Sequence, residues 1–483
     1  MADVRWQILT GGDDFMTRTR LTGAQVITMA TDRPPVEAAD IFIDGANIRR
    51  IGPGADDVRD GGEGETIDLT GKIVMPGLVN AHIHTWQSAL RLVAADWSLP
   101  EYLARAHGDI AGAYTPEDMR IGTLLGALAQ INAGITTIGD WSHNCTKYEH
   151  AAAAIEGLAH SGIRAAFLHG TPHGLRDRPH DTAMFDALAG GPIASSPLLT
   201  AGMAIKGPTL SSERNAIVDL TAARDRGVVA TMHQSSGTPG QTWDAVTRHA
   251  LWGPLVNIVH GTAVSDDLAR LLIDHGVTFT ATPENEQGQG HCTSVVDSVF
   301  RHGGSLSMGT DSDAFVSGDV RVAARMVLSR SRATEHQAHR VRTGSVVSAL
   351  STNQWDALSW ITREGANALG LAGRTGVLAP GMAADLIVLD ARDISTWPHH
   401  DALAVALHTH PGVVEAVMIG GTWRKRNGVI VDTDLAAIQD QAWQSGSRLV
   451  EHLNSTSLHR RVRRRVVQQV VQRSLSTPVK RES

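Results

Sequence analysis

Two histidines separated by one residue, His82 and His84, close a short apolar run of the sequence. Successive side chains of an extended strand point to opposite faces, so these two imidazoles share a face and can bind one cation together. Three further apolar runs also end on metal-type ligands, at His233, His260 and Asp311. Imidazole and carboxylate donors without thiolate suit zinc, iron or manganese. Three or four protein ligands would leave one coordination position for water, which indicates catalysis.

Between these ligands the chain alternates short β-rich runs with Ala/Leu-rich stretches, which is typical of βα units around a parallel barrel. Residues 115–133 and 265–275, for example, are expected to be helices. Active sites of such barrels lie at the carboxyl ends of the strands, where all the candidate ligands fall. The eight predicted strands end near His84, Asp140, His169, Lys206, His233, His260, Pro283 and Asp311.

The segments on either side of the predicted barrel contain short alternating strands with Gly and Asp turns, so we expect them to fold together. The predicted fold class is α/β, with a distorted (β/α)8 TIM barrel over residues 75–374 and a small discontinuous β-sandwich formed by residues 1–74 and 375–432. Residues 433–483 are expected to form a helix, from Asp434 to Asn454, and a basic tail. A chain of 483 residues is long enough for both domains.

Cysteine usage and hydropathy indicate the compartment. The two cysteines, Cys145 and Cys292, are too few for a disulfide framework, and residues 1–20 lack the apolar centre of a secretory signal. No run of eighteen apolar residues predicts a membrane span. We therefore expect a cytoplasmic protein that acts on a small molecule and has no membrane partner.

The segment after Asn454 holds eight Lys and Arg residues against one Glu, whereas the whole chain has a net charge of −7. The rest of the chain therefore carries about −14, and the tail is expected to fold onto its own acidic protein. A contact with nucleic acid or an anionic membrane is the alternative. No aromatic residues interleave with the arginines, and the acidic body would repel phosphate, so a nucleic-acid partner is disfavoured.

Taken together, these segments resemble the amidohydrolase superfamily, in particular the branch of methylthioadenosine/S-adenosylhomocysteine deaminases and triazine chlorohydrolases. The resemblance covers about nine-tenths of the chain. It implies one divalent metal ion, with Zn²⁺ ranked ahead of Fe²⁺ and Mn²⁺, and a homodimer or higher homo-oligomer. The matching segments are residues 41–52, the run 75–84 with its two histidines, residues 89–91 and 95–99, residues 365–371 and residues 376–390.

The expected mechanism follows from the ligands His82, His84, His233 and Asp311. The metal would lower the pKa of a bound water to about 7 and so supply hydroxide at neutral pH. His260 is either a further ligand or, as in the mononuclear members of the branch, a group that orients the attacking water and helps to move its proton; we favour the second role. Asp311 would also carry the proton toward the leaving group.

The chain departs from the related deaminases three residues beyond the fifth-strand histidine, where they have a glutamate and this chain has Ser236. A serine hydroxyl is far too weak an acid to protonate a ring nitrogen, so purine-type deamination is disfavoured. The loop after the seventh strand offers Glu284 and Glu286 as relocated acids. Helix capping or a solvent-facing position explains these glutamates equally well, and His291 has the same ambiguity.

Four residues are candidates for contacts with the substrate. Lys206, at the predicted end of the fourth strand, is expected to hold an anionic group, to be carbamylated and bridge two metals, or to be a surface lysine, in that order. Trp86 and Gln87 follow the first strand and could form a pocket wall on which a flat heterocycle or acyl group stacks. His291 is the fourth candidate, on the loop after the seventh strand.

The predicted function is that of a metal-dependent hydrolase whose metal-activated water cleaves a carbon–nitrogen bond, other than a peptide bond, of a small cyclic or amide-containing molecule. One alternative is an aminoheterocycle deaminase or aryl chlorohydrolase that uses Glu284 or Glu286 as its proton shuttle. An alternative of another class is a non-catalytic metal-containing protein that binds a small molecule on the same barrel.

Overall fold

The computed structural model describes residues 18–53, 64–172, 177–235, 237–455 and 458–475. The predictions that concern Ser236, the first seventeen residues of the sandwich and the last eight residues of the tail lie outside the described residues. Within the described part, no helix is both long enough and apolar enough to cross a membrane.

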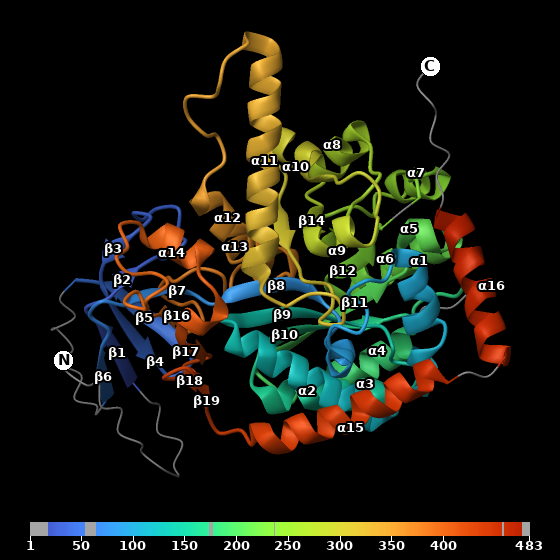
Figure 1. Cartoon of the computed structure of the whole chain (residues 1–483), viewed down its shortest axis with the longest axis horizontal. Coiled ribbons are helices and arrows are strands. Elements are labelled where there is room, and N and C mark those ends of the chain that lie inside the picture. Colours follow the sequence, from blue (N-terminus) through green and yellow to red (C-terminus); the bar gives the residue numbers. More distant parts are fainter. Residues whose placement is uncertain (1–17, 54–63, 173–176, 236, 456–457, 476–483) are drawn as a thin grey trace.

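The centre of the molecule is a parallel sheet of eight strands that are arranged in the order in which they occur along the chain (Figure 1). Its first and last strands meet at an isolated parallel bridge between Ile83 and Asp311, which closes the barrel. The predicted distorted (β/α)8 barrel is therefore confirmed. The strands are β8 (Leu78–Ile83), β9 (Ile135–Ser142), β10 (Arg164–Gly170), β11 (Leu199–Ile205), β12 (Ala230–His233), β13 (Val256–Val259), β14 (Thr278–Ala281) and β15 (Leu306–Met308).

Helices follow the strands and cover the outside of the barrel (Figure 1). Every residue of β9 and β10 is buried, because one face of these strands packs inside the barrel and the other packs against helices. The main helices of the barrel are α2 (Pro116–Asn132), α3 (Tyr148–Ser161), α4 (Thr182–Leu188), α6 (Glu213–Arg226), α7 (Gln241–Arg248), α8 (Asp266–Asp274), α10 (Val296–Arg301), α11 (Val320–Thr343), α12 (Gln354–Trp360) and α13 (Arg363–Ala368).

The barrel interior is closed at one end and carries the candidate ligands at the other. Ala366, Leu369 and Leu371 form a buried apolar cluster with Val79 at the start of β8 and with side chains of other strands. The amino ends of the strands are thus filled by apolar side chains. The chemistry-bearing residues lie at the carboxyl ends, where the loops after the strands can reach them.

Two smaller sheets enclose a second apolar core beside the barrel (Figure 1). Strands from both ends of the chain share the larger sheet, since β7 (Ile73–Pro76) pairs with β16 (Leu386–Leu389). The separate β domain of the predicted fold is confirmed, although β7 runs two residues past the predicted boundary at residue 74. The other strands are β1 (Arg18–Thr22), β2 (Gln25–Val26), β3 (Glu37–Ala38), β4 (Asp40–Asp44), β5 (Asn47–Gly52), β6 (Gly64–Asp68), β17 (Val414–Ile419), β18 (Thr422–Arg426) and β19 (Val429–Ile430).

Two helices follow the β domain. Helix α15 (Leu435–Asn454) is capped by the Asp434 side chain and matches the predicted helix. The basic segment after it is also helical over α16 (Leu458–Leu475), which the sequence did not predict. Helix α16 packs against α1 (Leu99–Tyr102) and η2 (Leu103–His107), two short helices in the connection between β8 and α2.

Candidate metal centre and active site

The two histidines of the first barrel strand stand where that strand meets the last one. The carbonyl of His82 accepts hydrogen bonds from the N–H groups of Thr310 (3.1 Å) and Asp311 (3.0 Å), and the N–H of His84 donates to the carbonyl of Asp311 (2.6 Å). A Cβ at Gly309 would lie 2.7 Å from the Cβ of His82, so only glycine fits there. The bonds that close the barrel thus place the Asp311 side chain beside both histidines.

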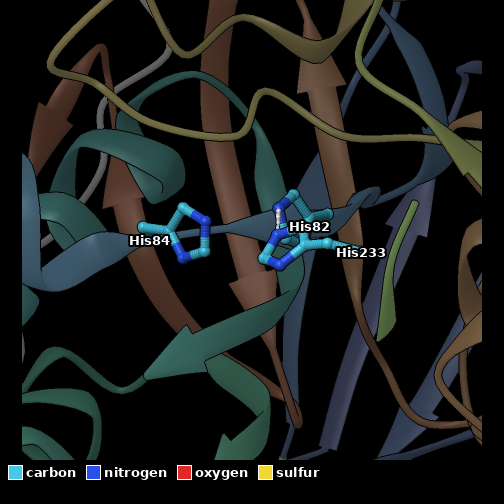
Figure 2. Close-up of side chains that lie close together, drawn as sticks. All are labelled: His82, His84 and His233. Atoms are coloured by element: carbon cyan, nitrogen blue, oxygen red, sulfur yellow. Dashed lines mark hydrogen bonds between the residues drawn. The ribbon is translucent and has the colours of Figure 1, made fainter. Parts of the chain in front are cut away.

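Four side chains converge at this point, from β8, β12 and the residues after β15. The ligand atoms of His82, His84 and His233 all lie within 4.8 Å of one another (Figure 2). Nε2 of His233 lies 3.3 Å from Nε2 of His82. Oδ1 of Asp311 lies 3.4 Å from Nε2 of His82 and 3.2 Å from Nε2 of His84. A tetrahedral ion with bonds of about 2.0–2.1 Å holds neighbouring donor atoms about 3.3 Å apart. The pairs His82–His233, His82–Asp311 and His84–Asp311 have this spacing.

The protonation pattern of the cluster also calls for a cation. Nδ1 of His84 donates to the carbonyl of Trp141 (2.8 Å), so Nε2 is the ring nitrogen that faces Oδ1 of Asp311. Burial lowers the pKa of His82 to about 3 and keeps that ring neutral. Although burial opposes ionisation, the neighbouring His82 and His84 hold the pKa of Asp311 well below its usual value. These electron-rich atoms repel one another unless a cation lies between them, and the donor set therefore fits a divalent metal ion.

The backbone is strained at two of the candidate residues. His260 and Asp311 follow β13 and β15 directly and have φ angles of +66° and +61°, in the left-handed region that favours glycine. A non-glycine residue held there costs roughly 1–3 kcal/mol, and such residues cluster at functional sites. At His260 the conformation is held by a hydrogen bond from its N–H to the carbonyl of Thr280 (2.8 Å).

His260 lies over the His233 ring, with the ring centroids 5.4 Å apart, and its Nδ1 faces away from the ligand cluster. Nδ1 of His260 lies 2.9 Å from the hydroxyl of Thr282 and 3.6 Å from Oε1 of Glu286. The same Glu286 oxygen accepts a hydrogen bond from the N–H of Thr282 (2.7 Å). Burial raises the pKa of Glu286 to about 7. The hydroxyl of Thr282 thus lies between Nδ1 of His260 and a carboxyl group whose pKa is close to neutral.

The two predicted acids occupy different surroundings on helix α9 (Pro283–Gly288). Burial raises the pKa of Glu284, whose charged neighbours are Asp319 and Arg325 near the start of α11. The charged neighbours of Glu286 are instead His291 and Asp311. The structure thus brings Glu286 to the ligand cluster and directs Glu284 toward α11. His291 also lies at the site, because its ring contacts that of His260 edge-on at 4.8 Å between centroids.

The other candidates for substrate contacts are buried. Lys206 follows β11, and burial together with Arg178 lowers its pKa. Trp86 is 1% exposed and packs its ring against that of Tyr114, as a core residue does. Gln87 accepts a hydrogen bond from the hydroxyl of Ser312 (2.6 Å), which is the residue after Asp311. This contact connects Gln87 to the loop that carries Asp311.

Several residues of the site have no motif that marks them in the sequence. Asn285 donates to Oδ2 of Asp311 (3.0 Å) and so orients that carboxylate. Tyr102 accepts a hydrogen bond from the Gln87 amide (2.7 Å), and Nε2 of His107 lies 3.0 Å from its hydroxyl oxygen. His143 lies edge-on to His84, with ring centroids 4.4 Å apart. Tyr102 and His107 lie in the long connection between β8 and α2. The length of that connection is the one sequence signal that could have drawn attention to these two residues.

The family model described as the amidohydrolase family matches residues 73–424 of this chain, which include all of the ligand cluster. The chain belongs to the amidohydrolase family. The predicted resemblance is thereby confirmed, as is the prediction of a hydrolase that acts on carbon–nitrogen bonds other than peptide bonds.

Curated relatives match along almost their whole length. The chain is 27% identical over 452 residues to a 5-methylthioadenosine/S-adenosylhomocysteine deaminase of Pelotomaculum thermopropionicum, a match that covers 90% of this chain and 99% of the relative. It is 26% identical over 459 residues to a 5'-deoxyadenosine deaminase of Methanosarcina mazei, with the same coverage. Each of these is a protein that this chain resembles.

Solved structures show the same fold. An adenosine deaminase from Xanthomonas campestris with bound zinc superposes with a TM-score of 0.73 at 22% identity, covering 90% of this chain and 99% of that one. An atrazine chlorohydrolase from Arthrobacter aurescens in complex with zinc gives a TM-score of 0.73 at 21% identity, covering 89% and 100%. Both similar structures contain zinc.

We predict that His82→Ala and Asp311→Asn each lose bound metal and activity together, because each removes a donor from the cluster. Metal per chain is measured by mass spectrometry after zinc loading and dialysis. His169→Ala is the matched control, since His169 is a buried histidine near the end of β10 that contacts His180 instead of the cluster. Full zinc content in His82→Ala would contradict the assignment.

We predict that Glu286→Gln keeps its metal and loses about 100-fold or more in kcat, the range expected for a proton-transfer group. The carboxylate accepts protons only when ionised. Since the pKa of Glu286 is raised to about 7, activity should fall as the pH drops through that value, and this limb should be absent in the variant. Glu284→Gln is the control and should retain both the rate and the acid limb. A fully active Glu286→Gln would remove Glu286 from the mechanism.

Proposed function

We propose that this protein is a mononuclear zinc-dependent hydrolase that cleaves a carbon–nitrogen bond in a small cyclic or amide-containing molecule. The observation that supports it most is the convergence of donor atoms of His82, His84, His233 and Asp311, three pairs of which lie 3.2–3.4 Å apart, as around one tetrahedral ion. Imidazole and carboxylate donors accept iron and manganese too. Zinc is ranked first because similar structures contain it.

In this proposal the protein side chains move the protons. When bound, the ion would lower the pKa of a coordinated water molecule to about 7. His260 takes a proton at Nε2 while its Nδ1, hydrogen-bonded to the Thr282 hydroxyl, holds the ring in place. Glu286 accepts or returns a proton at the Nδ1 side. Asn285 fixes Oδ2 of Asp311, so that Oδ1 stays directed at the two histidines.

An aminoheterocycle deaminase or aryl chlorohydrolase is the second candidate. Relatives named as deaminases and a similar structure named as a chlorohydrolase favour it. Such chemistry needs an acid that is protonated at neutral pH, and Ser236 cannot supply one. Glu286, whose pKa is raised to about 7, is the replacement that we propose. A non-catalytic small-molecule binder is the alternative of another class.

The predicted cytoplasmic location is also part of the proposal, and the two free cysteines agree with it.

Subunit pairing is a further part of the proposal. Helix α11 stands out from the body together with the segment that returns from it (Figure 1). None of the 25 residues from Ser329 to Asn353 is buried, and we call them the arm. Its apolar residues Val341, Val346 and Leu350 are exposed. The helical part of the arm, residues 329–343, buries no side chain, and an isolated helix of about 15 residues is only marginally stable in water.

The charge of the arm indicates which surface covers it. Four arginines in the arm outweigh one glutamate, while the chain as a whole is acidic. We propose that the arm lies on the acidic surface of a second copy of this chain, in a symmetric dimer. The arginines are Arg330, Arg332, Arg340 and Arg342, and the glutamate is Glu335.

We expect the zinc-loaded protein to turn over at least one member of a panel of cyclic imides, amides, aminopurines and chlorotriazines. Release of a carboxylate without ammonia or chloride supports the first candidate. Ammonia or chloride release supports the second. Saturable binding of panel members with no turnover of any of them would contradict both enzymatic candidates and leave the binder.

We expect the wild-type protein to sediment as a dimer and the double variant Val341→Asp/Val346→Asp to sediment as a monomer with unchanged zinc content. Analytical ultracentrifugation over a range of concentrations makes the measurement. Ile394→Asp, at an exposed isoleucine outside the arm, is the control and should remain dimeric. A monomeric wild type, or a dimeric double variant, would rule out the arm as the dimer contact.

A further inference from the structure

The basic C-terminal helix α16 lies beside the segment Leu99–Asp109, which contains α1 and η2 (Figure 1). The contact is close, because a Cβ on Gly108 would lie 3.3 Å from Cγ1 of Val467. A tenth of this chain has no counterpart in the deaminase of Pelotomaculum thermopropionicum, and the family match ends at residue 424. Helix α16 therefore lies outside the part of the chain that matches the family model.

One ion pair joins the helix to this segment. Nε of Arg464 donates to Oδ2 of Asp109 (2.5 Å), and the same guanidinium donates to the carbonyl of Leu453 at the end of α15. The other carboxylate oxygen of Asp109 lies 3.3 Å from Nε2 of His452. The Asp109 side chain is 8% exposed, and a carboxylate buried to this extent is costly without a charged partner. Arg464 is thus the cation that lets Asp109 remain buried.

The segment tied down by Asp109 crosses the rim of the barrel at the carboxyl ends of the strands. The N–H of Leu99 donates to the carbonyl of Gln289 (3.1 Å), in the loop after β14. Just before it, the N–H of Ala94 donates to the carbonyl of Ala314 (2.9 Å), in the loop after β15. The segment that begins after the first strand therefore reaches loops of the seventh and eighth strands.

The same segment carries side chains into the surroundings of the metal centre. Nε2 of His107 lies 3.0 Å from the hydroxyl of Tyr102 and 3.3 Å from Nε2 of His143. The ring of His143 in turn contacts that of His84, and Tyr102 is hydrogen-bonded to Gln87. Contacts thus lead from His107, two residues before Asp109 in the sequence, through His143 to His84, a proposed metal ligand.

We propose that Arg464 is a positioning residue: its ion pair with Asp109 holds Leu99–Asp109 so that Tyr102 and His107 form a polar wall beside the metal centre that binds substrate. The proposal rests on the proposed function for its substrate. In this proposal the basic helix α16 acts within its own subunit, where it holds the segment Leu99–Asp109 against the barrel rim. It predicts that loss of the ion pair loosens this segment without releasing the metal.

The first test needs no substrate. Hydrogen–deuterium exchange is measured on the zinc-loaded full-length protein for wild type, Arg464→Ala, Arg464→Lys and Arg463→Ala. We expect exchange in residues 99–109 to accelerate about tenfold or more in Arg464→Ala, with zinc content unchanged. Arg464→Lys should be intermediate, since it keeps the charge but not the guanidinium geometry. Arg463→Ala, at an exposed neighbour, should match wild type.

The second test uses whichever panel member is turned over. In Arg464→Ala, KM should rise about tenfold while kcat stays within about twofold, the signature of lost binding contacts. Asp109→Asn should show the same split. Unchanged exchange in residues 99–109, or a loss of zinc in Arg464→Ala, would overturn the proposal. Because the exchange test does not depend on turnover, it shows whether Arg464 holds residues 99–109 in place even if the proposed reaction is wrong.

Discussion

The arrangement of this protein depends on the proposed metal centre at the rim of the barrel. Buried imidazoles and a carboxylate that lie this close together are electron-rich groups, and a cation among them would offset their repulsion. The backbone is built to hold them nonetheless. The hydrogen bonds that close the barrel between His82 and Asp311 set the two strands in register, Gly309 allows their close approach, and the left-handed backbone at Asp311 aims the carboxylate at the histidines.

Two polar networks flank this point and differ in origin. On one side, His260 follows β13 and Glu286 lies on α9 after β14, with the Thr282 hydroxyl between them. On the other side, Tyr102 and His107 come from a segment between the first strand and the first long helix. The first network lies wholly within the residues that match the family model. The second depends on α16, which lies beyond the family match and so offers a way to adapt the same metal centre to a particular substrate.

The convergence of the proposed metal ligands could be predicted because strand ends have a simple geometry. Alternation along β8 put His82 and His84 on one face, and the parallel barrel brought distant strand ends to one rim. The choice between Glu284 and Glu286 could not be made in that way. It depends on how the short helix α9 is rotated about its axis, which burial against the barrel decides. The role of α16 depends on a contact between Arg464 and Asp109, some 355 positions apart in sequence, which no local pattern encodes.

A crystal structure of the zinc-loaded protein, with anomalous diffraction recorded on both sides of the zinc absorption edge, tests the central claim most directly. The account predicts one anomalous peak per chain, within about 2.0–2.2 Å of Nε2 of His82, His84 and His233 and of Oδ1 of Asp311. Two peaks bridged by Lys206, or a peak that leaves out any of these four side chains, would contradict it.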